Sequence, residues 1–197
     1  MAALVTPITY ICHKDGHIGL PLWVIFDKGV SKSMRYNQDV HHRQSIRLKN
    51  YDYSSVGMYY VTICTQDRAE LFGGAALCGR PDDADQMIIK WLKEIENKFL
   101  GICIDKFIIM PNHMHFIVRL QGGHAGPPLH EIVEWFKTMT TNEYIRGVKS
   151  GLYPPFNKRV WQRNYFERII RDNAEYQRIW QYIDENPARW AEDKYNV

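Results

Sequence analysis

Hydrophobic residues alternate with other residues along His113–Leu120, and this pattern predicts a β-strand. One face carries only apolar side chains, and the other carries His113, His115, Ile117 and Arg119. The apolar run at 102–109 is expected to be its antiparallel partner, because Pro111 and Asn112 suit the centre of a tight turn. The pattern therefore predicts a hairpin from which both imidazoles project on the same side.

Other periodicities extend this hairpin into an α+β fold. In chain order we expect a central strand at 58–65, a helix at 85–99, the hairpin, a helix at 129–147, a short strand at 158–162, helices at 164–172 and 173–185, and a short helix from Pro187. This order predicts a ferredoxin-like antiparallel sheet with helices packed on it, followed by a C-terminal helical tail from about residue 173.

The regular patterns begin at residue 45. Residues 1–44 show no sustained periodicity, so we expect an N-terminal extension that is disordered or not native to the domain, which itself spans 45–197. The apolar run at 20–26 is too short to cross a bilayer, and no membrane association is expected. The four cysteines form no C-x-x-C pair, which favours a reducing cytoplasm.

Basic residues gather in one part of the chain. Between Lys137 and Arg171 there are eight lysines and arginines against two acids, Glu143 and Glu167, with six aromatic residues among them. Single-stranded nucleic acid requires cations for its phosphates and flat rings for its bases. The segment is consistent with such a partner, and a solvated basic surface is the alternative.

The histidine pair is a candidate half of a metal site. Two neutral imidazoles on one face of a strand can bind one cation, although His-x-His also occurs in strands that bind none. A histidine-triad hydrolase requires a third histidine where this chain has Ile117. Any further ligand must therefore come from elsewhere in the chain.

Five segments together resemble one family. They are SIRLKNYDYSSVGMYYVTICT at 45–65, MPNHMHFIV at 110–118, FKTMTT at 136–141, WQRNYFERIIRD at 161–172 and YIDENPARW at 182–190. Their order is similar to that of the single-tyrosine HUH transposases, and in particular to the REP-associated tyrosine transposase branch. The resemblance covers roughly residues 43–193.

The resemblance implies an enzyme that nicks and rejoins DNA. In that family the two histidines of the HUH motif, here His113 and His115, bind Mg²⁺ or Mn²⁺. A tyrosine, matched here to Tyr165, attacks a phosphate of single-stranded DNA and forms a 5′-phosphotyrosine link. The link conserves the energy of the broken bond, which agrees with the absence of a G-x-x-x-x-G-K-[ST] motif from the sequence.

The third metal ligand departs from the family pattern. The family places it three or four residues after the tyrosine, where this chain has Arg168 and Ile169. Glu167 is the nearest carboxylate and is our candidate ligand; Asp172 and Asn173 are further candidates. Bound DNA could also complete the site, or this copy could be catalytically impaired.

The resemblance also implies the partners. We expect single-stranded or hairpin-forming repeat DNA, with phosphate contacts from Arg119, Lys137, Arg163 and Arg168, each of which could instead be a surface ion pair. The protein is expected in the bacterial cytoplasm, acting at the nucleoid, as a monomer or homodimer. The alternatives are an impaired DNA-binding protein on the same fold and another HUH nuclease, either a replication initiator or a relaxase.

Overall fold

The computed structural model of the chain describes residues 51–73, 83–121 and 126–196. In chain order its elements are β1 (Gly57–Cys64), η1 (Gln66–Arg68), α2 (Asp83–Lys98), β2 (Ile102–Met110), β3 (His113–Leu120), α3 (Leu129–Lys149), β4 (Phe166–Ile170), α4 (Asn173–Glu185) and η2 (Pro187–Glu192). The extension predicted at 1–44 lies outside the described residues.

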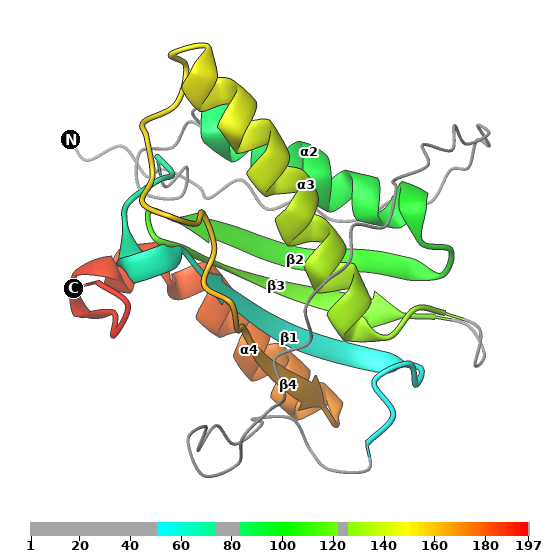
Figure 1. Ribbon diagram of the computed structural model, residues 1–197. Helices are drawn as coiled ribbons and strands as arrows, with labels where there is room; N and C mark the ends of the chain where they lie inside the picture. Colours follow the sequence, from blue (N-terminus) through cyan, green and yellow to red (C-terminus); the bar gives the residue numbers. More distant parts are fainter. Residues whose placement is uncertain (1–50, 74–82, 122–125, 197) are drawn as a thin grey trace, which may run out of the picture.

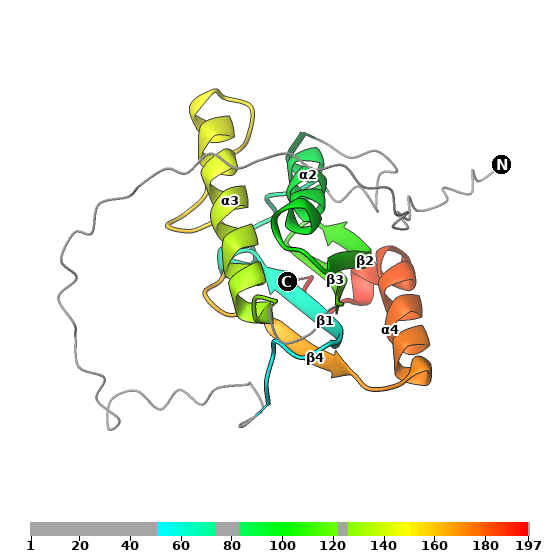
Figure 2. The same cartoon turned by 90° about the vertical axis from the view of Figure 1, so that its right-hand side faces the viewer.

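The four strands form one antiparallel sheet in the order β2-β3-β1-β4. Helices α2 and α3 cover one face and α4 lies against the other, so the sheet is enclosed between two helical layers (Figures 1 and 2). The expected α+β class, antiparallel sheet, central first strand and helical tail are confirmed. In the part of the chain that the structure describes, none of the helices is long and apolar enough to cross a membrane.

The predicted hairpin is present as β2 and β3. Met110 pairs with His113, which leaves Pro111 and Asn112 to form the turn. The apolar face of β3, with Met114 and Phe116, lies in the main hydrophobic core against α2 and α3. The two histidines therefore project from the opposite face, which α4 covers.

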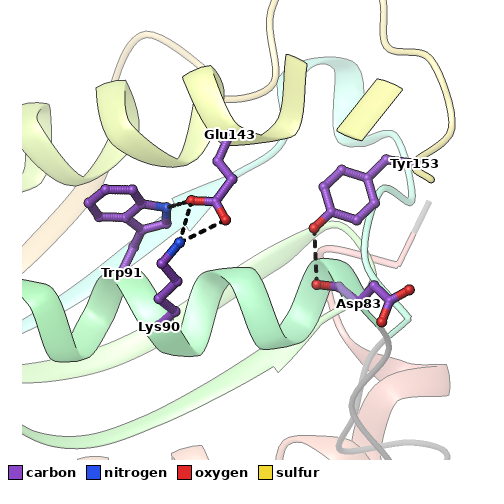
Figure 3. Close-up of polar contacts among 5 residues, drawn as sticks. All are labelled: Asp83, Lys90, Trp91, Glu143 and Tyr153. Carbon is purple, nitrogen blue, oxygen red and sulfur yellow. Dashed lines mark hydrogen bonds and ion pairs between the residues drawn. The ribbon is translucent and has the colours of Figure 1, made fainter. Parts of the chain in front are cut away.

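Polar contacts join the two helices of the core layer (Figure 3). Glu143 of α3 accepts hydrogen bonds from Lys90 Nζ at 2.9 Å and from Trp91 Nε1 at 2.6 Å, both on α2. Beyond the end of α3, the Tyr153 hydroxyl donates to the Asp83 carbonyl at 3.1 Å. Glu143 thus turns toward α2 and away from the outer side of α3.

Helix α4 lies across the other face and is tied to both edges of the sheet. Asp172 caps its first turn by accepting from the backbone N–H of Glu175 at 2.7 Å. The Glu175 carboxylate in turn accepts from Arg168 of β4 at 2.6 Å. Near the other end, Asp184 pairs at 2.6 Å with Lys106 of β2, an edge strand. Both attachments fix the helix over the histidines.

The prediction of a helix at 164–172 is wrong. Residues Phe166–Ile170 form β4, which pairs with β1. A strand is favoured here because β1 would otherwise leave a row of backbone groups unpaired, and because β-branched Ile169 and Ile170 suit a sheet. The strand expected at 158–162 is reduced to a single bridge between Thr65 and Trp161. Apart from this absent helix, the predicted order of elements is right, with the fourth strand displaced along the chain.

Candidate metal centre

The two strand histidines converge on one point. The Nε2 atoms of His113 and His115 lie 3.1 Å apart, and both side chains are fully buried. Their opposite ring nitrogens are held by hydrogen-bonding neighbours. His115 Nδ1 lies 2.8 Å from the hydroxyls of both Tyr60 and Thr62, and His113 Nδ1 lies 2.9 Å from the Asn112 amide oxygen. Such partners orient imidazoles whose free nitrogens bind a metal.

Burial keeps both imidazoles neutral. Desolvation lowers the pKa of His113 to about 4 and that of His115 well below its ordinary value. The proximity of the two rings lowers the pKa of His115 further, because a proton on one repels a proton on the other. Neutral imidazole is the form that binds metal, so the pair is ready for a cation at neutral pH.

Asp193, which follows η2, completes a three-residue group with the histidines. One ligand atom from each of the three residues lies within 4.8 Å of the others. Asn186 Nδ2 donates to Asp193 Oδ2 at 3.0 Å, and Asn186 Oδ1 is buried without a hydrogen-bond partner among the described residues. Two imidazoles, a carboxylate and a spare amide oxygen are a donor set that fits a divalent cation.

The structure does not bring Tyr165 to this site. Tyr165 precedes β4 and packs against the main core, with Lys137 Nζ of α3 at 5.2 Å from its ring centroid. Glu167 pairs in register with Val61, whose side chain also lies in that core. Because paired residues on neighbouring strands share a face, both Tyr165 and Glu167 lie on the face opposite the histidines.

A different tyrosine lies beside the pair. Tyr182 of α4 has its ring centroid 5.3 Å from that of His115, and it lines a pocket with Asn186 and Asp193. Burial raises its pKa to about 12, while hydrogen bonds with Asn186 and Tyr60 act in the opposite direction. The YIDENP segment contained the sequence pattern that could have pointed to Tyr182. Positions four apart on a helix, here Tyr182 and Asn186, share one face.

The four arginines and lysines expected to contact DNA divide between the two faces. Arg119 and Arg168 belong to strands on the histidine side and form ion pairs with Asp105 at 3.5 Å and Glu175 at 2.6 Å. Lys137 and Arg163 lie on the α3 side and line one groove. The structure therefore brings the last two together and separates them from the first two.

Comparison with known proteins agrees with this architecture. The family described as "Transposase IS200 like" matches residues 53–186, a segment that includes the sheet, the histidine pair and Tyr182. The chain belongs to the IS200-like transposase family. The resemblance inferred from the five segments is confirmed, and a transposase-like role follows for the chain.

Relatives of this transposase family member include two proteins of Haemophilus influenzae. One, of uncharacterised function, is 35% identical over 83% of this chain and 98% of its own length. The other carries the provisional name of REP-associated tyrosine transposase and is 23% identical, over 72% of this chain and 77% of its own. A solved REP-associated tyrosine transposase bound to a REP hairpin has the same fold, with a TM-score of 0.54, 18% identity and 77% coverage of each chain.

Proposed function

We propose that the protein is a metal-dependent endonuclease and strand transferase for hairpin-forming single-stranded DNA, and that Tyr182 is its nucleophile. The observation that carries this assignment is the position of Tyr182, whose ring lies 5.3 Å from the ring of His115, centroid to centroid. Sequence matching pointed to Tyr165. That residue is partly buried against the core on the other face of the sheet, away from the histidines.

His113, His115 and Asp193 would hold the divalent cation, with the Asn186 amide oxygen available beside them. Bound there, a divalent cation neutralises charge on the scissile phosphate and so stabilises the transition state. Mixed imidazole and oxygen ligands suit Mn²⁺ well, and Mg²⁺ accepts the oxygen ligands.

Tyr182 supplies the attacking oxygen. Its raised pKa means that the phenol is protonated at rest, so the proton must leave as the Oη–P bond forms. The bond from phosphorus to the 3′ oxygen breaks in the same displacement, and that oxygen departs as a 3′-hydroxyl. The 5′ phosphate remains on Tyr182, and attack by another 3′-hydroxyl reverses the step and joins two strands.

A single chain contains the whole site, because α4 packs on its own sheet through Lys106 and Asp184. The site is closed in this state. Trp190 and Tyr195 lie against His113, with ring centroids at 5.9 and 4.6 Å. A phosphate can reach the histidines only after the segment that carries Tyr195 moves aside, so DNA binding and opening of this segment are coupled.

Covalent capture tests the proposal. The protein is incubated with Mn²⁺ and a set of single-stranded hairpin oligonucleotides, labelled at the 3′ end, and is then run on a denaturing gel. Wild type and Tyr165→Phe are expected to give a protein–DNA adduct, whereas Tyr182→Phe and His115→Ala give none. An adduct that persists in Tyr182→Phe and disappears in Tyr165→Phe would reject the assignment.

The second candidate function is DNA binding without cleavage. The complete burial of both histidines favours it, because no phosphate reaches them in the closed state. Hairpin binding with no adduct under Mg²⁺ or Mn²⁺, even after removal of 194–197, would support this alternative.

A further inference from the structure

A groove on the α3 side of the sheet is lined by four basic residues. It has a volume of about 370 Å³ and lies between the outer side of α3 and the segment 156–163. In Figure 1 this segment runs down beside α3 before the chain enters β4. Lys158, Arg159 and Arg163 are exposed along it, and no acidic residue is among the described residues that line the groove. Glu143, the acid of this part of α3, is held by α2 instead.

The floor and the opposite rim of the groove differ from the basic rim. Phe156, Val160 and Ile145 contribute apolar surface, and Thr138 and Asn142 of α3 offer hydroxyl and amide groups at the other side. A flat apolar base, a sugar and a charged phosphate require this succession of surfaces. A duplex hides its base faces, so the arrangement favours a single strand.

The backbone beneath the basic rim is held by hydrogen bonds from α3. The Lys137 ammonium lies 3.0 to 3.4 Å from the carbonyl oxygens of residues 162, 163 and 164, and Trp161 Nε1 donates to Thr140 at 2.8 Å. Burial lowers the pKa of Lys137 to about 8, so it keeps its charge at neutral pH. Lys158 adopts a φ of 59°, which is uncommon for a residue with a side chain. A backbone that is already held in place lowers the entropic cost of binding.

The groove and the histidine site share one end of the sheet. Trp161 bridges to Thr65, and the preceding residue of β1, Cys64, pairs with His113. A DNA strand that leaves the groove at Gln162 would therefore reach the end of β1. The histidine site lies at this same end, on the opposite face of the sheet. Arg68 and Lys194 add positive charge at this end, since both contact Tyr195.

We propose that this groove binds a single-stranded DNA segment that flanks the hairpin, with phosphates on Lys158, Arg159 and Arg163 and bases on the apolar floor. The inference rests on the proposed function for its choice of DNA. It adds a second contact region, on the opposite face of the sheet from the bond that is cut.

The test measures binding of an oligothymidine strand of about 16 nucleotides, the upper site size of one single-strand-binding fold. The groove variant combines Lys158→Ala, Arg159→Ala and Arg163→Ala. The control variant removes three exposed helix cations that do not line the groove, with Lys98→Ala, Arg146→Ala and Lys149→Ala. Fluorescence anisotropy gives Kd at several salt concentrations, and thermal melting confirms that both variants are folded.

The groove variant is expected to bind at least about tenfold more weakly, with a salt slope shallower by about 2, since each phosphate neutralised on a single strand contributes about 0.7. The control is expected to lose much less. Equal losses in both variants, or no loss in the groove variant, would overturn the proposal. An abasic strand that competes as well as oligothymidine would also overturn it.

The adduct assay separates this inference from the proposed function. The groove variant keeps Tyr182 and the histidines, and is expected to form the Tyr182 adduct only at higher DNA concentrations than wild type requires. If wild type forms the adduct and the groove variant binds DNA normally, the proposed role of the groove is refuted and the proposed function stands. If binding depends on the groove but no divalent metal yields an adduct, the proposed cleavage is refuted and the role of the groove stands.

Discussion

Each residue of the histidine site is held by a specific neighbour. His115 would lose much of its orientation without the hydroxyls of Tyr60 and Thr62, each 2.8 Å from its Nδ1. His113 depends in the same way on Asn112, which the turn of the hairpin places next to it. These neighbours determine which ring nitrogen would face a bound cation, and therefore how tightly a cation would bind.

Tyr60→Phe is expected to weaken Mn²⁺ binding by about 10- to 100-fold, because it removes a hydroxyl that orients His115. Isothermal titration with Mn²⁺ measures the change. Tyr59→Phe is the matched control. The Tyr59 hydroxyl, on the neighbouring residue of β1, donates to the Ser55 carbonyl at 2.9 Å, and its side chain lies in the core on the other face. Similar Mn²⁺ affinities for the two variants would contradict this account of His115.

Stability in the absence of metal is expected to fall in mild acid. Burial lowers the pKa of His113 from 6.5 to about 4, so below pH 6.5 the unfolded chain binds a proton that the folded chain refuses. The free energy of unfolding therefore decreases as the pH falls from about 6.5 toward about 4. Urea unfolding in EDTA across this range measures the slope.

His113→Gln is the comparison for this slope. Glutamine does not titrate, so the variant is expected to lose stability less steeply over the same pH range. Acid groups that also titrate, such as Glu175, are present in both proteins and cancel in the difference. Parallel curves for wild type and variant would show that His113 is not buried in its neutral form.

At the scale of elements, α4 is the part that makes a site from separate strands. It carries Tyr182 and is followed directly by Asn186, and its position depends on contacts with both edge strands. Lys106 is 2% exposed, and its ammonium lies 3.0 Å from the centroid of the Trp180 ring as well as 2.6 Å from Asp184. A buried lysine with both partners on one helix is a strong attachment point for that helix.

Lys106→Met is expected to destabilise the protein by about 1–2 kcal/mol, because the ion pair is half-open to solvent at Asp184 and methionine retains most of the apolar stem. Urea unfolding measures the loss, and hydrogen exchange is expected to rise mainly in α4. Lys90→Met is the control, with an expected effect below about 0.5 kcal/mol, since Lys90 is exposed at its ion pair with Glu143. Equal effects of the two substitutions would contradict the special role of Lys106.

The sequence predicted most of these elements because their signals are local. Alternation predicted the hairpin and both faces of β3. The strand at 166–170 was missed because five residues fit a helical or an extended pattern equally well, and pairing with the distant β1 decides between them.

The site was predictable only in part for the same reason. His113 and His115 lie two residues apart on one strand, so their shared direction follows from the sequence. The positions of Tyr182 and Asp193 depend on how α4 crosses the sheet and on where the chain goes after η2. Neither is a local property. Tyr165 was favoured because it was matched to the family's tyrosine on a helix expected at 164–172, and this segment instead enters β4.

At the scale of the whole molecule, the sheet separates two regions that the proposals join. The candidate metal site lies on the α4 side of the sheet, next to Tyr182, whereas the basic groove lies beside α3. Both regions reach the same end of β1, through the pairing of Cys64 with His113 and the bridge from Thr65 to Trp161. A single strand bound at this end could contact both regions while a hairpin remains outside.

The central claim is that Tyr182 carries the DNA after cleavage, and peptide mapping of the covalent adduct tests it directly. Trypsin cleavage after Arg178 and Arg189 gives a peptide, 179–189, in which Tyr182 is the one tyrosine, while Tyr165 lies in the peptide 164–168. After nuclease trimming of the DNA, mass spectrometry is expected to find the nucleotide phosphate on 179–189. A nucleotide on 164–168, with 179–189 unmodified, would contradict the account.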